Sequence, residues 1–218
     1  MNRRRLYLMR HAEVAYFDTE GRPVGVADVG LTGDGEEQGR AAAKVFAGIA
    51  LDRVITSGLE RTLATARIVA PGREPESWPE LRELEAGRLS EIPADDLEDA
   101  FLGSFRGIVP EETKFLGGET IGSLLDRVLP ALGRLLSDPS WDVALAVLHG
   151  GVNRAILSYA LTRERLFLGG FEQSPACINV VDVGDDWIVR AVGITPYDLA
   201  HTTTRQTTME LLFAQYRP

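Results

Sequence analysis

The sequence predicts an α/β protein with a mixed central sheet. Short apolar runs typical of buried strands alternate with stretches of helical spacing, which is the pattern of a sheet covered by helices. Near the C-terminus two such runs, Ile178 to Val183 and Trp187 to Val192, are joined by Gly184-Asp185-Asp186. This arrangement indicates a hairpin, which adds antiparallel strands to an otherwise mostly parallel sheet. The length of 218 residues suits a single domain over residues 1–218.

The first strand and helix are read from the N-terminal residues. Leu6 to Met9 is an apolar run and predicts a fully buried strand. A helix starts near residues 31–35, with either Thr32 or Asp34 as its N-cap. At helical spacing, the apolar face of this helix is predicted to consist of Ala42, Val45, Phe46 and Ile49.

A second strand and helix follow directly. Val54-Ile55 is a short apolar run and predicts the strand. The helix after it extends from Leu59 to Ala70 and stops at Pro71, because proline cannot continue a helix. A third extended piece leads through Trp78-Pro79 towards Leu81.

The middle of the chain contains a stretch without clear periodicity. Residues 88–118 fit neither helical nor strand spacing and are interpreted as an insertion or lid. A long helix opens after it at Gly118-Glu119-Thr120. Its inward residues are expected to be Leu124, Leu125, Val128, Leu132 and Leu135.

The clearest buried strand is Val143 to Leu148, which leads through His149 and two glycines into a helix from Val152 to Leu161. A last helix covers about Thr207 to Tyr216. Its apolar side chains are interpreted as a packing surface or as the interface of a homodimer. They are Met209, Leu212 and Phe213.

Composition argues against several classes of function. The net charge of −9 repels nucleic acid, and the sequence has no basic stripe or zinc-ligand spacing. The apolar run after Arg3-Arg4-Arg5 is too short for a signal-peptide core, and no segment approaches the length of a membrane span. The single cysteine, Cys177, lies in an apolar run, which indicates a buried thiol in a reducing compartment. A cytoplasmic protein that binds neither nucleic acid nor membrane is expected.

Two of the three histidines come just after predicted strands. His11 follows the first strand and His149 follows the clearest one, and the carboxyl ends of strands are where α/β sheets place ligand sites. Transfer of a phosphoryl group requires cations around its oxygens, a nucleophile in line and a proton for the leaving oxygen. Arg10, beside His11, can donate two parallel hydrogen bonds to such an anion.

The other groups that phosphoryl transfer needs are also present. Arg61 lies one turn inside the second predicted helix, near a helix N-terminus that itself attracts anions. Gly150, directly after His149, allows backbone N–H groups to approach an anion closely. Glu83 and Glu85 are both candidates for the proton donor at this point.

Motifs in this sequence resemble those of the histidine phosphatase superfamily, also called phosphoglycerate-mutase-like. The resemblance covers most of the chain, because six matching segments occur in the family's order. It selects Glu83 over Glu85 as the acid. The matching segments are Leu8-Met9-Arg10-His11-Ala12-Glu13, Leu31-Thr32 with Gly35 and Gln38, Ser57 to Arg61 with Thr65-Ala66, Leu81-Arg82-Glu83 with Gly87, Gly117-Gly118-Glu119-Thr120, and Val147-Leu148-His149-Gly150-Gly151.

The resemblance implies a fold and a role for each candidate. The fold would be a three-layer α/β/α sandwich. His11 would attack phosphorus and become phosphohistidine, while Arg10, Arg61 and His149 would hold the phosphoryl oxygens. Glu83 would protonate the leaving group and later activate water. The resemblance implies no metal and no cofactor.

The chain also departs from the family pattern. Ala12 replaces a glycine, so the loop after His11 must accept a Cβ atom. Phe17 stands where many members have an asparagine that helps to bind phosphate, and the neighbouring Asp18 is a poor substitute for it. Leu148 replaces a common serine, which predicts a drier pocket. Glu13 is a further candidate, either for positioning groups near the pocket or as a surface residue.

The expected function is hydrolysis of small-molecule phosphomonoesters through a phosphohistidine. A phosphoglycerate mutase-type phosphotransferase is the first alternative, but between Glu91 and Gly118 only Arg106 and Lys114 could hold a second acidic group. A phosphoprotein phosphatase and a non-catalytic relative that binds a phosphorylated ligand remain further alternatives. Glu83 argues against phosphohistidine substrates, because an imidazole leaving group needs less help from an acid.

Overall fold

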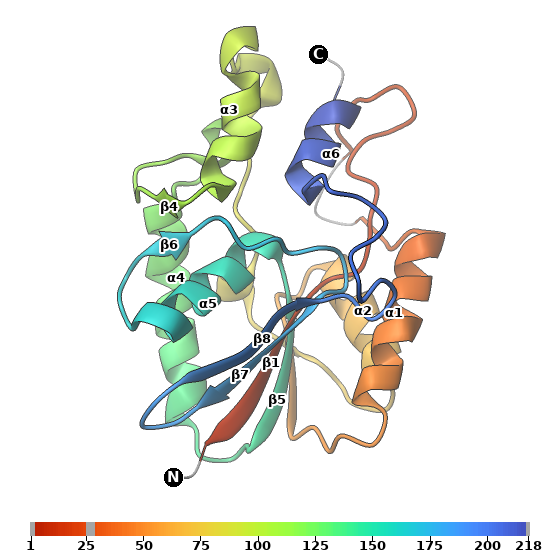
Figure 1. Cartoon of the computed structure of the whole chain (residues 1–218), viewed down its shortest axis with the longest axis vertical. Helices are drawn as coiled ribbons and strands as arrows, with labels where there is room; N and C mark the ends of the chain where they lie inside the picture. The colour runs from red at the N-terminus through yellow and green to blue at the C-terminus, as the bar shows by residue number, and fades with distance from the viewer. Residues whose placement is uncertain (1–2, 25–28, 217–218) are drawn as a thin grey trace.

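The computed structural model describes residues 3–24 and 29–216 (Figure 1). Within these residues a six-stranded sheet forms the centre of the molecule. In spatial order its strands are β3 (Glu76–Ser77), β2 (Arg53–Thr56), β5 (Val143–Leu148), β1 (Arg4–Arg10), β7 (Ile178–Val183) and β8 (Ile188–Ile194).

Strand direction changes twice across the sheet, because only β7 of the six strands runs opposite to the others. Strands β3, β2, β5 and β1 are parallel, whereas β7 pairs antiparallel with β1 and β8 pairs antiparallel with β7. The predicted hairpin is therefore confirmed as β7 and β8, at one side of the sheet, and so is a mostly parallel mixed sheet. The four parallel strands end at the same edge, which brings the loops that follow them together.

Helices cover both faces of the sheet (Figure 1). Helices α1 (Gly33–Phe46) and α2 (Glu60–Val69) lie on one face, and α4 (Ile121–Ser137) and α5 (Gly150–Thr162) lie on the other. Successive residues of a strand point to opposite faces. In β5, Leu145 accordingly belongs to the core under α1 and α2, while its neighbours face the core under α4 and α5. The predicted three-layer α/β/α sandwich is confirmed.

The first helix shows where periodicity predicted correctly and where it did not. Thr32, not Asp34, is the N-cap, and its hydroxyl accepts a hydrogen bond from the Gly35 backbone N–H. Ala42 and Phe46 are buried as predicted, but Val45 is 44% exposed. Ile49 lies beyond the end of the helix at Phe46. The buried positions of α1 repeat every three or four residues up to Phe46, and Val45 falls off that stripe.

Other boundaries follow the prediction closely. Helix α4 begins after Thr120, whose hydroxyl caps it by accepting from the Ser123 backbone N–H. The third extended piece contributes only the two residues of β3 to the sheet edge and then turns into a short 3-10 helix, Pro79–Leu81. No helix among the described residues is long and apolar enough to cross a membrane.

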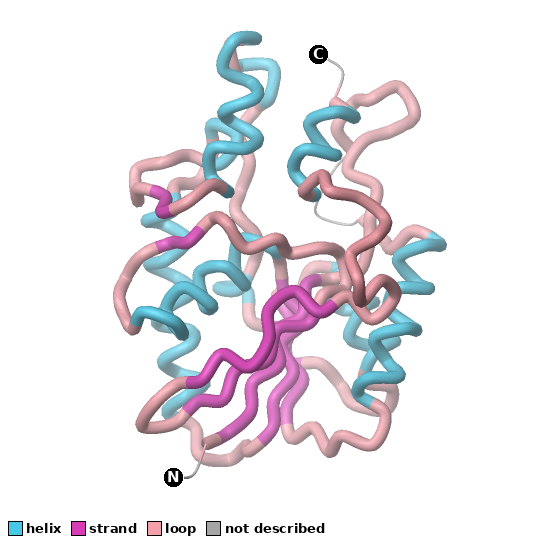
Figure 2. Tube along the Cα trace, viewed as in Figure 1, coloured by secondary structure: helices cyan, strands magenta, loops and turns pink. Residues whose placement is uncertain are grey.

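The segment 88–118 has little regular structure, as its poor periodicity predicted (Figure 2). It contains 3-10 turns, the short helix α3 (Leu97–Leu102) and the short strand β4 (Ile108–Val109). Strand β4 pairs antiparallel with β6 (Phe167–Leu168) outside the main sheet.

Helix α3 packs against the last helix, α6 (Thr208–Gln215), beyond the carboxyl edge of the sheet (Figure 1). The ring centroids of Phe101 and Phe213 lie 5.4 Å apart, and Met209 and Leu212 pack against the same apolar cluster. The apolar side of the last helix is therefore a packing surface within the chain. Residues 88–118 together with α6 form a unit beside the main sheet, called the cap.

Candidate active site

Four charged or titratable side chains gather at the carboxyl ends of β1, β2 and β5. Arg10, His11, Arg61 and His149 are all buried, with exposed fractions of 7% or less. The imidazole centroids of His11 and His149 lie 5.3 Å apart. The parallel strands produce this meeting, because the His11 backbone N–H extends the β1–β5 ladder by donating to the Leu148 carbonyl at 2.9 Å.

The orientation of the His11 ring is set by its own main chain. Nδ1 lies 2.7 Å from the Ala12 carbonyl oxygen, so the ring proton is placed there and Nε2 carries the free electron pair. Burial lowers the pKa of His11 well below its usual value, and the nearby Arg10 and Arg61 lower it further. A neutral imidazole with Nε2 unprotonated is the form that a nucleophile requires.

His149 is held from the side of β2. The Ser57 hydroxyl lies 2.8 Å from Nε2 of His149, while Nδ1 is buried and has no hydrogen-bond partner among the described residues. Burial, followed by the charges of His11 and Arg61, lowers its pKa well below the usual value. When Ser57 donates to Nε2, the ring proton lies on Nδ1, and an anion oxygen could accept it.

Arg10 is fixed at one end and available at the other. Its Nη1 donates to the Gln173 carbonyl at 2.5 Å and to the Thr208 hydroxyl at 3.1 Å. Its Nε is buried and has no partner among the described residues. A buried, unpaired donor on a permanent cation is costly unless an anion completes it, which is the behaviour expected of a phosphate-binding arginine.

Glu83 reaches the same edge of the sheet from the loop after β3. Its two carboxylate oxygens accept from the Gly151 backbone N–H at 3.1 and 3.0 Å, and one also accepts from the Leu84 N–H. A Cβ atom at Gly151 would lie 2.6 Å from the Glu83 carboxylate, so this approach requires glycine. Glu85, the other sequence candidate, is exposed. The geometry therefore brings Glu83 to the site and leaves Glu85 outside it.

Gly150 is the point on which several charged groups converge. A Cβ atom built there would lie 3.1 Å from Nη1 of Arg154, 3.7 Å from the Glu83 carboxylate and 3.9 Å from Nε of Arg10. Gly150 is also the first residue of α5, where backbone N–H groups lack partners within the helix. The structure thus places the predicted Gly150 beside both the candidate acid and a candidate cation.

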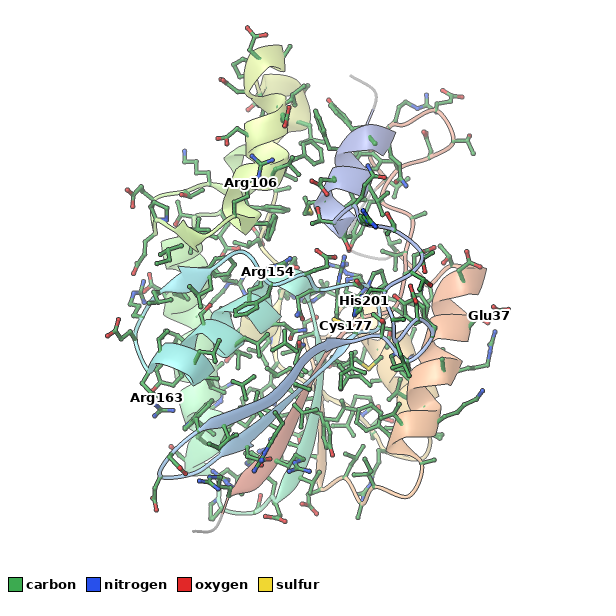
Figure 3. The ribbon with its side chains drawn as sticks, in the orientation of Figure 1. Glu37, Arg106, Arg154, Arg163, Cys177 and His201 are labelled. Carbon is green, nitrogen blue, oxygen red and sulfur yellow. The ribbon has the colours of Figure 1, made fainter. Side chains whose placement is uncertain are left out.

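Arg154 is a residue of this region that the sequence analysis missed (Figure 3). It is 5% exposed, its guanidinium lies 4.6 Å from the centroid of the Phe105 ring, and burial lowers its pKa to about 10. Glu172 is 3.8 Å away. A helical spacing of four residues from Gly150 was the available signal, because it puts both on one face of α5.

Tyr16 and Ser57 were also missed as contacts of the two histidines. The Tyr16 hydroxyl lies 3.2 Å from Nε2 of His11, on the loop that leaves β1. Sequence spacing alone gives no signal for this contact, since it depends on the path of an irregular loop. Ser57 belongs to one of the matched motifs, but that motif was used only to place Arg61.

Two residues have structural roles near the site. The Glu13 carboxylate accepts from the Thr32 hydroxyl at 3.0 Å, and its backbone N–H donates to the Gln38 side chain. Glu13 thereby connects the loop after His11 to the start of α1. Cys177 is fully buried as predicted, and burial raises the pKa of its thiol to about 12.

A cavity of about 860 Å³ opens beside His11 and Arg10. Residues 13–21 contribute one part of its lining and residues 195–215 contribute another. The third histidine, His201, is exposed and also lines this cavity (Figure 3). The space is of the size that accommodates a small organic ligand.

Comparison with known proteins matches this chain to one family. The sequence profile of the histidine phosphatase superfamily (branch 1) matches residues 6–194. A protein of Enterobacter sp. (strain 638) named "Probable phosphoglycerate mutase GpmB" is 36% identical over 149 residues, which cover 66% of this chain and 69% of that protein. A protein of the same name from Salmonella paratyphi A is 34% identical over the same length.

Solved structures share the fold over most of this chain. A mycobacterial glucosyl-3-phosphoglycerate phosphatase complexed with VO3 superimposes with a TM-score of 0.69 at 25% identity, covering 87% of this chain and 98% of that chain. The alpha-ribazole phosphatase from Shigella flexneri gives a TM-score of 0.68 at 24% identity, covering 87% and 96%.

The two buried histidines predict a specific dependence of stability on pH. Their folded-state pKa values are lowered, so below pH 6.5 the unfolded chain binds protons that the folded chain does not. Between pH 7.5 and 5.5 the free energy of unfolding should therefore fall by up to about 1.4 kcal/mol per histidine. Thermal unfolding across this range measures the slope.

Histidine variants test whether the two buried histidines cause this pH dependence of the free energy of unfolding. His11→Gln and His149→Gln should each flatten it, whereas His201→Gln, which changes an exposed histidine, should leave it as in the wild type. Equal slopes in all three variants would mean that the site histidines are not held neutral.

Proposed function

The chain belongs to the histidine phosphatase superfamily (branch 1), and on this premise we propose that it hydrolyses small-molecule phosphomonoesters through a phosphohistidine. One observation carries the proposal. The Ala12 carbonyl fixes the His11 proton on Nδ1, so that Nε2 is unprotonated and can act as a nucleophile among buried arginines. The cavity beside His11 provides room for the rest of a small substrate.

In the first step Nε2 of His11 attacks phosphorus and the bond from phosphorus to the ester oxygen breaks. Arg10, Arg61 and His149 hold the nonbridging oxygens, whose negative charge must be balanced within a buried site. Glu83 gives a proton to the departing alkoxide, which leaves as an alcohol.

In the second step water attacks the phosphorus of the phosphohistidine. The bond from phosphorus to Nε2 breaks, and the Glu83 carboxylate takes a proton from the water. Inorganic phosphate leaves, and His11 returns to its neutral form. Glu83 therefore acts first as an acid and then as a base.

Charge in the cap supports hydrolysis over transfer to a sugar acid. Arg106 is exposed and lies 4.0 Å from Glu98, and Lys114 is exposed as well (Figure 3). Neither side chain is held in a position to bind a second acidic group of the substrate. Arg154 adds a buried cation near Gly150, but Glu172 lies 3.8 Å away and offsets part of its charge. A mutase-type phosphotransferase remains the alternative, since curated relatives carry that name.

The remaining alternatives are less well supported by the residues. A phosphoprotein phosphatase would need an open approach to His11, whereas here His11 is 2% exposed. A non-catalytic binder would have no reason to keep His11, Glu83 and His149 together.

We also propose that residues 88–118 serve as a lid, that the protein acts in the cytoplasm without nucleic acid, and that any homodimer leaves the site intact.

Replacement of the nucleophile tests the proposed function directly. His11→Ala should abolish release of phosphate from phosphomonoesters, because no other group can take up the phosphoryl. Rapid alkaline quenching with labelled substrate should place phosphate on His11 in the wild type, because the bond from phosphorus to the imidazole nitrogen survives in alkali and is lost in acid. Near-native melting of the variant is the folding control, and wild-type turnover by His11→Ala would exclude the mechanism.

Glu83→Gln separates an acid from a structural residue. An alkyl phosphate leaves as a basic alkoxide and needs a proton, while an activated aryl phosphate leaves as a stable phenolate. The variant should therefore slow alkyl phosphates far more than activated aryl phosphates, by about 10²–10⁴-fold. Glu85→Gln, the matched change at an exposed position, should have little effect. Equal slowing of both substrate types would mean that Glu83 acts only in the attack of water or has a structural role.

A further inference from the structure

The contact between Tyr16 and His11 has a defined direction. The His11 ring proton is on Nδ1, facing the Ala12 carbonyl, so Nε2 can only accept. The Tyr16 hydroxyl, 3.2 Å from Nε2, must therefore be the donor. Its hydrogen points at the electron pair that attacks phosphorus.

Tyr16 also lies beside the phosphate-binding cation. The phenol oxygen is close enough to Arg10 to act electrostatically on its guanidinium. The hydroxyl thus lies near both the nucleophilic nitrogen and a cation, and the oxygens of a bound phosphoryl group would come to the same region. A donor placed there in advance can stabilise negative charge as it develops.

The neighbouring residues, Phe17 and Asp18, supply no donor to this region. The family resemblance implies an asparagine at position 17 that would help to bind phosphate. Here the Phe17 ring packs into the apolar cluster of the cap, 5.9 Å from the Tyr216 ring centroid. Asp18 does not compensate, because its carboxylate accepts from backbone N–H groups of its own loop and pairs with Arg22.

The backbone of the loop holds Tyr16 in place. The Val24 N–H donates to the Tyr16 carbonyl at 2.9 Å, and Phe17 forms a bridge with Pro23. Phe17 packs into the apolar cluster of the cap, while the Tyr16 hydroxyl contacts His11.

We propose that Tyr16 is a catalytic residue that supplies the phosphate-binding donor missing at position 17. Its O–H bonds to Nε2 of His11 in this structure and moves to a nonbridging phosphoryl oxygen when a phosphomonoester binds. The shift frees the Nε2 electron pair for attack, and no proton leaves the phenol. Tyr16 is only half-buried, so its side chain has room to move aside. This inference rests on the proposed function of His11.

The experiment compares two deletions of a single hydroxyl. Tyr16→Phe removes the donor and keeps the ring. Tyr7→Phe is the matched control, because Tyr7 lies in β1 and packs edge-on against Phe46 of α1, outside the site. For each variant, kcat/KM is measured with an alkyl and an aryl phosphate. Binding of inorganic phosphate is measured by calorimetry, and folding is checked by thermal melting.

Loss of a hydrogen bond to a charged group should lower kcat/KM about ten- to one-hundredfold for both substrates and weaken phosphate binding to a similar extent. Tyr7→Phe should match the wild type in each measurement. Unchanged kinetics and phosphate binding in Tyr16→Phe would overturn the proposal. Higher activity would also overturn it, since the Tyr16 hydroxyl would then only block Nε2 of His11.

The two proposals can fail separately. If the wild type forms no phosphohistidine at His11, the proposed function fails whatever Tyr16 does. If the wild type does form it and Tyr16→Phe binds inorganic phosphate as tightly as the wild type, only the role of Tyr16 fails. Phosphate binding needs no turnover, so it tests the donor independently of the chemical steps.

Discussion

Parallel pairing of β1 with β5 and of β5 with β2 is the constraint on which the site depends. The register sets Arg10 opposite Leu148, so His11 and His149, each the next residue along, emerge side by side. The same edge receives Ser57 from β2, which fixes the second imidazole. A slip of one residue in either ladder would turn these side chains to the other face of the sheet. The cores on both faces, which specify the register, therefore also specify the geometry of the histidines.

Burial then determines the chemistry of these groups. Imidazoles withdrawn from water beside arginines lose their protons readily, and the arginines cannot lose theirs. The result is a neutral imidazole at His11 with buried arginines around it, and Nε of Arg10 has no hydrogen-bond partner among the described residues. Such a site is costly for the folded chain, and a phosphate dianion would relieve that cost. The acidic net charge of −9 leaves this local field as the main attraction for the anion.

How far the sequence could predict this structure depended on the kind of element. Buried strands and helices with caps were predicted to within a few residues, because apolar periodicity and Thr32 or Thr120 carry direct signals. The parts of the site that follow strands, His11 and His149, were likewise readable. Tyr16 and Arg154 were not, since their positions depend on an irregular loop and on packing against Phe105. Residues 88–118 of the cap offered no periodicity because their short turns are held by long-range contacts.

One of those long-range contacts connects the cap to the reaction centre. Nη1 of Arg10 donates to the hydroxyl of Thr208, the first residue of α6, and Glu172 accepts from the same residue's N–H and O–H. The other end of α6 packs against α3 through aromatic rings. The orientation of the Arg10 guanidinium thus depends on a helix about two hundred residues further along the chain. Helix α6 of the cap is therefore part of what holds Arg10 in position, and it also lines the cavity beside His11.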